Sequence, residues 1–206
     1  MTTNLIPFKT RAKDEMIACA KVYKSTLLDY EYLVCSKAFV KYPYYIISAY
    51  KGNYKHLTGV ESHLSPDDFF DKCLDGTLTE NDFSFVKPGY TEAEVKGSVR
   101  RKLSVLHNID NIFSSQTQIE EDFIKGNIHC SFATANSECT IGFSISKKVK
   151  PKTLLKGNIL TPGKSCGFDL VLRKLHSDDK FNTVLIGDED SLNKYNKDIS
   201  NIIDLR

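Results

Sequence analysis

The apolar positions of the N-terminal segment, from about residue 12 to 37, recur at steps of three and four residues. This spacing places them on one stripe and predicts an amphipathic helix. Asp14 and Glu15 fall in the first turn of that helix, where negative side chains suit the positive end of the helix dipole. The stripe consists of Ile17, Ala20, Tyr23, Leu27, Tyr30 and Val34.

Two further helices are marked by their start and stop signals. Ser65 is placed to cap a helix that ends at Gly76. Thr91 and Glu94 have the spacing of a capping box, and the segment after them predicts a third, charged helix through "VKGSVRRKLSVLHNIDNIF". Between the first two helices, the β-branched and aromatic stretch "YPYYIISAY" at 42–50 favours a strand.

After Ser114 the pattern changes from helical spacing to an alternation of apolar and small polar residues. Residues 128–134 and 139–146 alternate in this way and are joined by "ANSE", which predicts a β-hairpin. The segments "CGFDLVLRKL" and "NTVLIGDED" predict two more strands, and the tail "LNKYNKDISNIIDLR" predicts a short helix. The expected architecture is α+β, with N-terminal helices followed by an antiparallel sheet of about four to five strands, in a single domain spanning residues 1–206.

The composition restricts the classes of protein to consider. The chain has 206 residues, of which 41% are hydrophobic and 26% charged, and this suits one globular domain. The formal net charge of +2 is small, so we expect any site for a polyanion to be local. No apolar run reaches the roughly 18 residues of a membrane span, and none precedes the first charges of the N-terminal segment. We therefore expect no export by a leader and no insertion into a membrane.

The cysteines and histidines indicate neither a disulfide framework nor a cofactor. Six cysteines are scattered without a CxxC pair, which is typical of free thiols in a reducing cytoplasm. The five histidines do not follow the spacing of metal-binding motifs. "TPGKS" at 161–165 contains the Gly-Lys-Ser of a phosphate loop but lacks its first glycine. We expect no cofactor and no metal.

His56 is the residue whose chemistry raises the sharpest question. It lies in "YKHLTGV", on the short connection that leads into the next helix, and an imidazole titrates near neutrality. It could move protons during phosphodiester cleavage, in which a ribose 2′-hydroxyl attacks its own phosphate without a metal ion. Such a reaction also needs cations to hold the charge of the phosphorane. The available cations are Lys55, Arg100, Arg101, Lys102 and Lys152.

Each of these features also has a structural interpretation. His56 and Thr58 can simply shape the entry to the next helix. Lys102 lies inside the apolar stripe of the third helix, so it extends to water, pairs with Asp110, or lies in a cleft and binds an anion. A strand face rich in hydroxyls is a solvated face unless it faces the helix that carries Arg100 and Lys102. The hydroxyl residues are Ser131, Thr140, Ser144 and Ser146.

The order of these features resembles a class of nucleases. A helical start precedes "HLTGV", "DFFDKCLDGTL", the charged helix "EVKGSVRRKLSVLHNIDNIF" and the segments "IHCSFAT" and "CTIGFSIS". Together they resemble phage-associated nuclease-like domains of the barnase/EndoU/colicin/RelE class, in the branch with a histidine in a His-Leu-small-Gly-aliphatic motif. The resemblance covers about residues 12–160 as a nuclease-like core and leaves 161–206 as C-terminal strands and a short tail.

The resemblance implies the N-terminal helices and antiparallel sheet already expected, and a metal-independent ribonuclease reaction that gives a cyclic phosphate. On this resemblance His56 is the motif histidine, with Thr58 and Gly59 beside it. The basic residue on the following helix corresponds to Arg101 or Lys102, because "RRKL" offers three cations where one arginine is expected.

Two hypotheses about function follow. In the first, the chain is a cytoplasmic phage or toxin-type endoribonuclease whose catalytic residues are His56, Arg101 and Lys102. Its substrate-binding residues would be Lys55, Thr58, Arg100, Ser144 and Lys152. In the second, the chain is a noncatalytic phage/host interaction module of the same fold, and its basic helix binds a protein or nucleic-acid partner.

Overall fold

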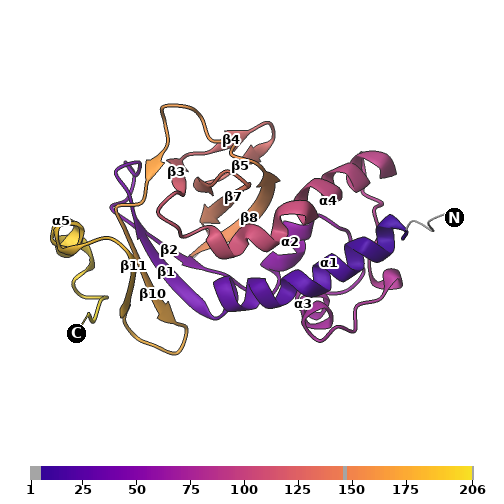
Figure 1. Ribbon diagram of the computed structural model, residues 1–206, viewed down its shortest axis with the longest axis horizontal. Helices are drawn as coiled ribbons and strands as arrows, with labels where there is room; N and C mark the ends of the chain where they lie inside the picture. The colour runs from indigo at the N-terminus through magenta and orange to yellow at the C-terminus, as the bar shows by residue number, and fades with distance from the viewer. Residues whose placement is uncertain (1–5, 146–147, 206) are drawn as a thin grey trace, which may run out of the picture.

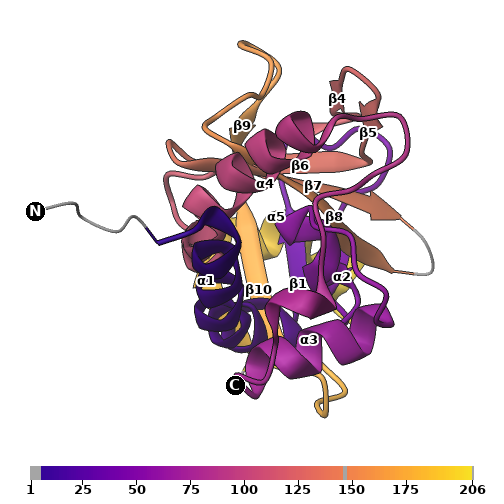
Figure 2. The same ribbon diagram turned by 90° about the vertical axis from the view of Figure 1, so that its right-hand side faces the viewer.

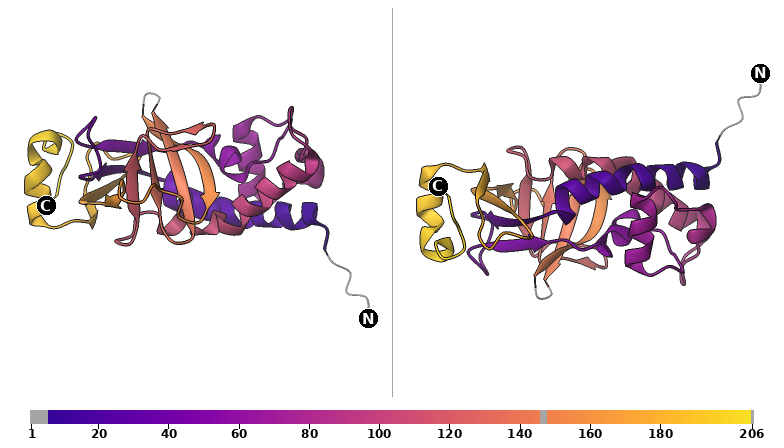
Figure 3. Two further views of the ribbon diagram at one scale, coloured as in Figure 1. Left: turned by 90° about the horizontal axis from the view of Figure 1, so that it is seen from above. Right: turned by 90° about the horizontal axis from the view of Figure 1, so that it is seen from below.

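The computed structural model describes residues 6–145 and 148–205. Its longer helices are α1 (Phe8–Tyr23), α2 (Asn53–Thr58), α3 (Pro66–Leu74), α4 (Glu92–Leu106) and α5 (Glu189–Ile199). Its short π and 3₁₀ segments are η1 (Lys24–Leu28), η2 (Glu80–Asp82) and η3 (His107–Asn111). Helices α1 to α4 gather toward one end of the long axis and α5 lies at the other end, with the β-sheet between them (Figure 1 and Figure 3).

The strands form one large, curled sheet and one small ribbon. They are β1 (Tyr30–Cys35), β2 (Tyr45–Ser48), β3 (Gln118–Glu121), β4 (Ile124–Lys125), β5 (Ile128–His129), β6 (Phe132–Ala135), β7 (Cys139–Ile145), β8 (Val149–Lys156), β9 (Cys166–Gly167), β10 (Leu170–Leu175) and β11 (Thr183–Ile186). In the described part of the chain, the large sheet has nine strands in the order β11-β10-β1-β2-β8-β7-β6-β3-β9. β4 and β5 form the separate ribbon.

The expected antiparallel sheet of about four to five strands is wrong, although the chain does combine helices with a sheet. The large sheet of the described residues has nine strands, and it is mixed because β2 and β8 run parallel. Two of its strands, β1 and β2, come between the helices α1 and α2 in the sequence, so the helices do not all precede the sheet. The parallel pair aligns Ile47 with Val149, and no local pattern of residues can predict a pairing between such distant segments.

The predicted N-terminal helix is correct in its first half and wrong in its second. α1 ends at Tyr23, and the chain becomes strand β1 from Tyr30 onward. β1 is buried on both faces: Tyr32 belongs to the main core, while Leu33 and Cys35 belong to a second core under α5. A strand that is buried on both faces reads as a continuous apolar run, and its residues happened to continue the helical spacing.

The other predicted elements are largely confirmed. The Ser65 hydroxyl accepts from the backbone N–H of Asp68 at the start of α3, and Thr91 and Glu94 form a reciprocal capping box on α4. β6 and β7 form the predicted hairpin, and β10, β11 and α5 lie in the predicted C-terminal segments. β10 pairs with β1, so the C-terminal strands extend the sheet beside an N-terminal strand.

β8 is the strand against which two of the helices pack. It pairs with β7 on one side and β2 on the other, and both α2 and α4 pack against it (Figure 2). Helix α4 and the end of α2 are thereby held beside the same strand. This arrangement brings the segments at 53–60, 98–102 and 150–152 together.

Two findings bear on the class of protein. No described helix is both long enough and apolar enough to cross a membrane. All six cysteines are free thiols, and five of them are buried.

Candidate active site

His56 lies in the last turn of α2, and not on a connection as the sequence suggested. The residues beside it complete the end of this helix. The Leu57 side chain is buried, and the Thr58 hydroxyl donates to the carbonyl oxygen of Lys55 at 2.8 Å. Gly59 ends the helix with a φ of 80°, in the left-handed region that glycine adopts most easily. The His56 ring makes no hydrogen bond with any described residue, so it takes no part in ending the helix.

Lys102 ties α4 to the end of α2. Its Nζ donates to the carbonyl oxygen of His56 at 2.9 Å, and carbonyls in a last helical turn have no partner within the helix. Its stem lies against Gly59, where an added Cβ would be 2.8 Å from the Lys102 Cδ. Lys102 forms no ion pair with Asp110 or another described acid. Its ammonium therefore lies in the cleft between the two helices.

Gly59→Ala is expected to lower the free energy of unfolding by more than the conformational cost of a left-handed alanine, which is about 1–2 kcal/mol. The excess arises because the new methyl group must displace the Lys102 stem. Gly76→Ala is the matched control, since Gly76 has a φ of 73° but no atom within 4 Å of an added Cβ. Urea denaturation of both variants measures the difference. Equal losses would show that the contact with Lys102 is unimportant.

A pocket of about 380 Å³ opens beside this junction. Its lining comes from the end of α2, the segment after it, the loop before α4, α4 itself and β8. The residues are Lys55, His56, Gly59, Val60, Glu61, Lys87, Ser98, Lys102 and Lys152. We call this the His56 pocket. It brings together His56, Lys55, Lys102 and Lys152 from the sequence-based candidates.

Lys152 reaches the His56 pocket from a β-bulge. Opposite β7, Gly142 pairs with Thr153 and Phe143 pairs with Pro151, so Lys152 is the extra residue of β8 and has no partner in the register. Bulges redirect a side chain from the regular alternation of a strand. The bulge therefore explains how a residue of β8 contributes an ammonium group to a pocket built largely from helices.

The lysines of the His56 pocket leave positive charge unneutralised. Lys87 pairs with Glu61 at 3.6 Å, but the other three lysines form no ion pair with a described acid. Each of these three ammonium groups donates to a backbone carbonyl oxygen instead. The pairs are Lys55 with Ser62 (3.4 Å), Lys102 with His56 (2.9 Å) and Lys152 with His129 (2.6 Å). Because an ammonium has three donors, each is held in place and can still bind an anion.

The surroundings lower the pKa of both central groups. The pKa of His56 lies below its ordinary value of 6.5, first because the ring loses hydration and then because Lys55 and Lys102 carry positive charge. The pKa of Lys102 falls to about 8, mainly through burial and further through the charge of Lys87. At neutral pH, His56 is therefore mostly neutral and can accept a proton, while Lys102 is mostly protonated and can donate one.

The remaining candidates lie elsewhere. Thr58 is fully buried and its hydroxyl donates to the carbonyl oxygen of Lys55, while Arg101 is exposed and lines neither the His56 pocket nor the pocket between α1 and α4. Arg100 lines a different pocket, between α1 and α4. Ser144 lines a third pocket, beside β5. Ser146 lies outside the described residues.

Three lining residues were not found from the sequence. Glu61 follows the "HLTGV" motif directly, but nothing in its neighbours distinguishes it from a solvated acid. Lys87 precedes a Pro-Gly turn, and Ser98 is a small residue within α4. Only the packing of their segments around α2 brings them to the pocket, so no local signal could have identified them.

Comparison with known proteins identifies a family of nuclease-like proteins. A family model described as phage-Barnase-EndoU-ColicinE5/D-RelE like nuclease4 matches residues 15–200. Searches of the curated proteins and of the solved structures gave no match. The matched region includes the whole His56 pocket.

Proposed function

The chain belongs to the phage-Barnase-EndoU-ColicinE5/D-RelE like nuclease4 family, and from this premise we propose that it is an endoribonuclease that cleaves RNA without a metal ion. The reaction takes place in the His56 pocket. One observation carries the proposal: an imidazole with no hydrogen bond to a described residue opens onto a pocket that also holds Lys55, Lys102 and Lys152. Proton transfer and neutralisation of phosphate charge are the two requirements of this chemistry.

In the proposed step, the neutral His56 ring removes the proton of a ribose 2′-hydroxyl. The 2′-oxygen attacks the adjacent phosphorus, and the bond between phosphorus and the 5′-oxygen of the next nucleotide breaks. The leaving oxygen takes a proton from the Lys102 ammonium, which is a stronger acid than an ordinary lysine because its pKa is about 8. The products are a 2′,3′-cyclic phosphate and a 5′-hydroxyl.

The other lysines hold the phosphate during this step. Lys55 and Lys152 have donors left over for the non-bridging oxygens, which carry increasing charge as the phosphorane forms. Lys87 is partly neutralised by Glu61 and adds to the field that favours an anion. The net charge of the chain is only +2, so binding relies on these few contacts and suits a particular RNA site better than a long backbone.

The proposal is tested by incubating the protein with total cellular RNA in excess chelator. We expect discrete fragments with 2′,3′-cyclic phosphate and 5′-hydroxyl ends. An oligonucleotide with the cleaved sequence but a single 2′-deoxy sugar at the cleavage position should remain intact, since it lacks the attacking hydroxyl. Binding of RNA without cleavage would reject the enzyme and favour the noncatalytic module. Cleavage of the deoxy control would reject the mechanism.

A further inference from the structure

A second pocket, of about 350 Å³, lies between α1 and α4. Each helix contributes a matching face, with residues at positions i, i+3, i+4 and i+7, as expected for one side of a helix. From α1 these are Phe8, Arg11, Ala12 and Glu15; from α4 they are Arg100, Leu103 and Ser104, followed by His107 at the start of η3. We call this the arginine pocket. Nothing in the proposed reaction uses it.

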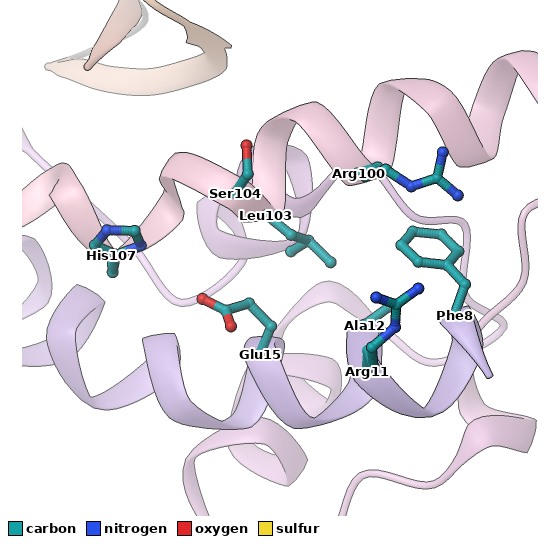
Figure 4. A pocket seen from close by; sticks show the side chains of 8 residues that line it. All are labelled: Phe8, Arg11, Ala12, Glu15, Arg100, Leu103, Ser104 and His107. Atoms are coloured by element: carbon teal, nitrogen blue, oxygen red, sulfur yellow. The ribbon is translucent and has the colours of Figure 1, made fainter. Parts of the chain in front are cut away.

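The two guanidinium groups lie at the same end of the arginine pocket. Figure 4 shows Arg11 and Arg100 beside the Phe8 ring, one from each helix. Neither forms an ion pair with a described acid, although Glu15 follows Arg11 by four residues on α1 and would be a natural partner. Two guanidinium groups without an ion pair at one end of a pocket give that end the positive charge and the N–H donors that a phosphate binds.

Phe8 holds the Arg100 guanidinium in position. The Arg100 guanidinium lies over the Phe8 ring at 4.8 Å, and the ring is also stacked on Phe85 at 5.3 Å. The aromatic pair therefore supports Arg100 and is not free to stack on a ligand. Any flat, apolar part of a ligand must instead lie farther along the pocket, against the buried side chains of Ala12 and Leu103.

The opposite end of the arginine pocket has a different chemistry. Figure 4 shows the Glu15 carboxylate and the His107 ring toward this end, away from the two arginines. Glu15 forms no ion pair with a described residue and accepts only a contact from the Cys19 thiol at 3.3 Å. It can accept hydrogen bonds from an amino group of a ligand. The pocket thus has an anion-binding end, an apolar middle and an acceptor end.

A pocket with different chemistry at its two ends suits an elongated ligand. Each face extends over seven residue steps, from Phe8 to Glu15 and from Arg100 to His107, or about 10 Å at 1.5 Å per residue. We propose that the arginine pocket binds a nucleoside 5′-monophosphate, with its phosphate at Arg11 and Arg100. The base lies over Ala12 and Leu103, and its exocyclic amine donates to Glu15. The 5′-phosphorylated end of an RNA shares this chemistry.

The arginine pocket is separate from the His56 pocket. Arg100 and Lys102 are two residues apart on α4, and this spacing turns their side chains by about 200° around the helix. α4 therefore stands between the two pockets. The proposal does not depend on the ribonuclease reaction, because the two pockets share no residue.

Calorimetric titration of the full chain with AMP, adenosine and inorganic phosphate tests this proposal. We expect saturable binding of AMP, and binding at least about tenfold weaker for adenosine or phosphate alone. Arg11→Gln and Arg100→Gln should each weaken AMP binding by about tenfold or more. Arg101→Gln removes a charge from the next position of α4 but from neither pocket, and it should leave the affinity unchanged.

Glu15→Gln separates the two ends of the pocket. It should weaken AMP binding but not phosphate binding, because the lost carboxylate served the base and repelled the phosphate. A 5′-phosphorylated trinucleotide that displaces AMP, when its 5′-hydroxyl form does not, would identify an RNA end as a second source of the ligand. Absence of saturable AMP binding would overturn the proposal. So would binding that is lost in His56→Ala but retained in both arginine variants, since it would place AMP in the His56 pocket.

Discussion

His56→Ala is expected to lower the rate of RNA cleavage by about 10²–10⁴-fold, the usual contribution of a general acid or base. The fold should be retained, because the contacts at the end of α2 are made by Leu57, Thr58, Gly59 and the backbone of His56. Single-turnover cleavage measures the rate, and thermal unfolding verifies the fold.

His63→Ala is the matched control for this prediction. His63 is exposed, lies seven residues further along and does not line the His56 pocket. The His63→Ala variant should cleave RNA at the same rate as the unchanged chain. If the His56 and His63 variants have the same rate, the imidazole of His56 has no part in the reaction.

Lys102→Arg is expected to lower the rate by about 10²–10³-fold, similar to the loss of one group that stabilises the transition state. Arginine retains the positive charge but cannot give up a proton, because its pKa is above 12. The variant should also change the dependence of the rate on pH. In the unchanged chain, the rate rises as His56 loses its proton, below pH 6.5, and falls as Lys102 loses its proton, near pH 8. The fall near pH 8 should disappear in Lys102→Arg.

Two further variants separate this chemical role from the structural role of Lys102. Lys102→Met keeps most of the stem beside Gly59 but loses the ammonium group, so it should lose activity while the chain stays folded. Arg101→Gln removes the adjacent charge and should keep the fall in rate near pH 8. If the cleavage rate of Lys102→Arg still falls near pH 8, the group that loses its proton there is not Lys102.

The parts of the fold that the sequence predicted are those with local causes. Ser65 and Thr91 cap helices through atoms three residues away, and the β6–β7 hairpin follows from alternation across a short turn. β1 could not be predicted in the same way, because its burial on both faces depends on β10, β2 and α5. The parallel pairing of Ile47 with Val149 likewise depends on the complete fold.

The residues of the candidate site show the same difference between local signals and contacts that depend on the complete fold. His56 and Lys102 could be selected from the sequence because each is a chemically active residue in an unusual setting, a short motif and an apolar stripe. The separation of Arg100 from Lys102 follows from their angle on one helix. The contribution of Glu61 could not be anticipated, because it depends on segments that meet only in three dimensions.

The most direct test of the account follows the His56 ring by NMR while an RNA analogue with a 2′-deoxy sugar at the cleavage position is added. The account predicts that the ring resonances shift on binding and that the pKa of His56 rises from its lowered value, because a phosphodiester beside the ring stabilises the imidazolium. The resonances of His63 should not change. Binding of the analogue with no change at His56 would contradict the account, because the phosphodiester would then lie away from the His56 pocket.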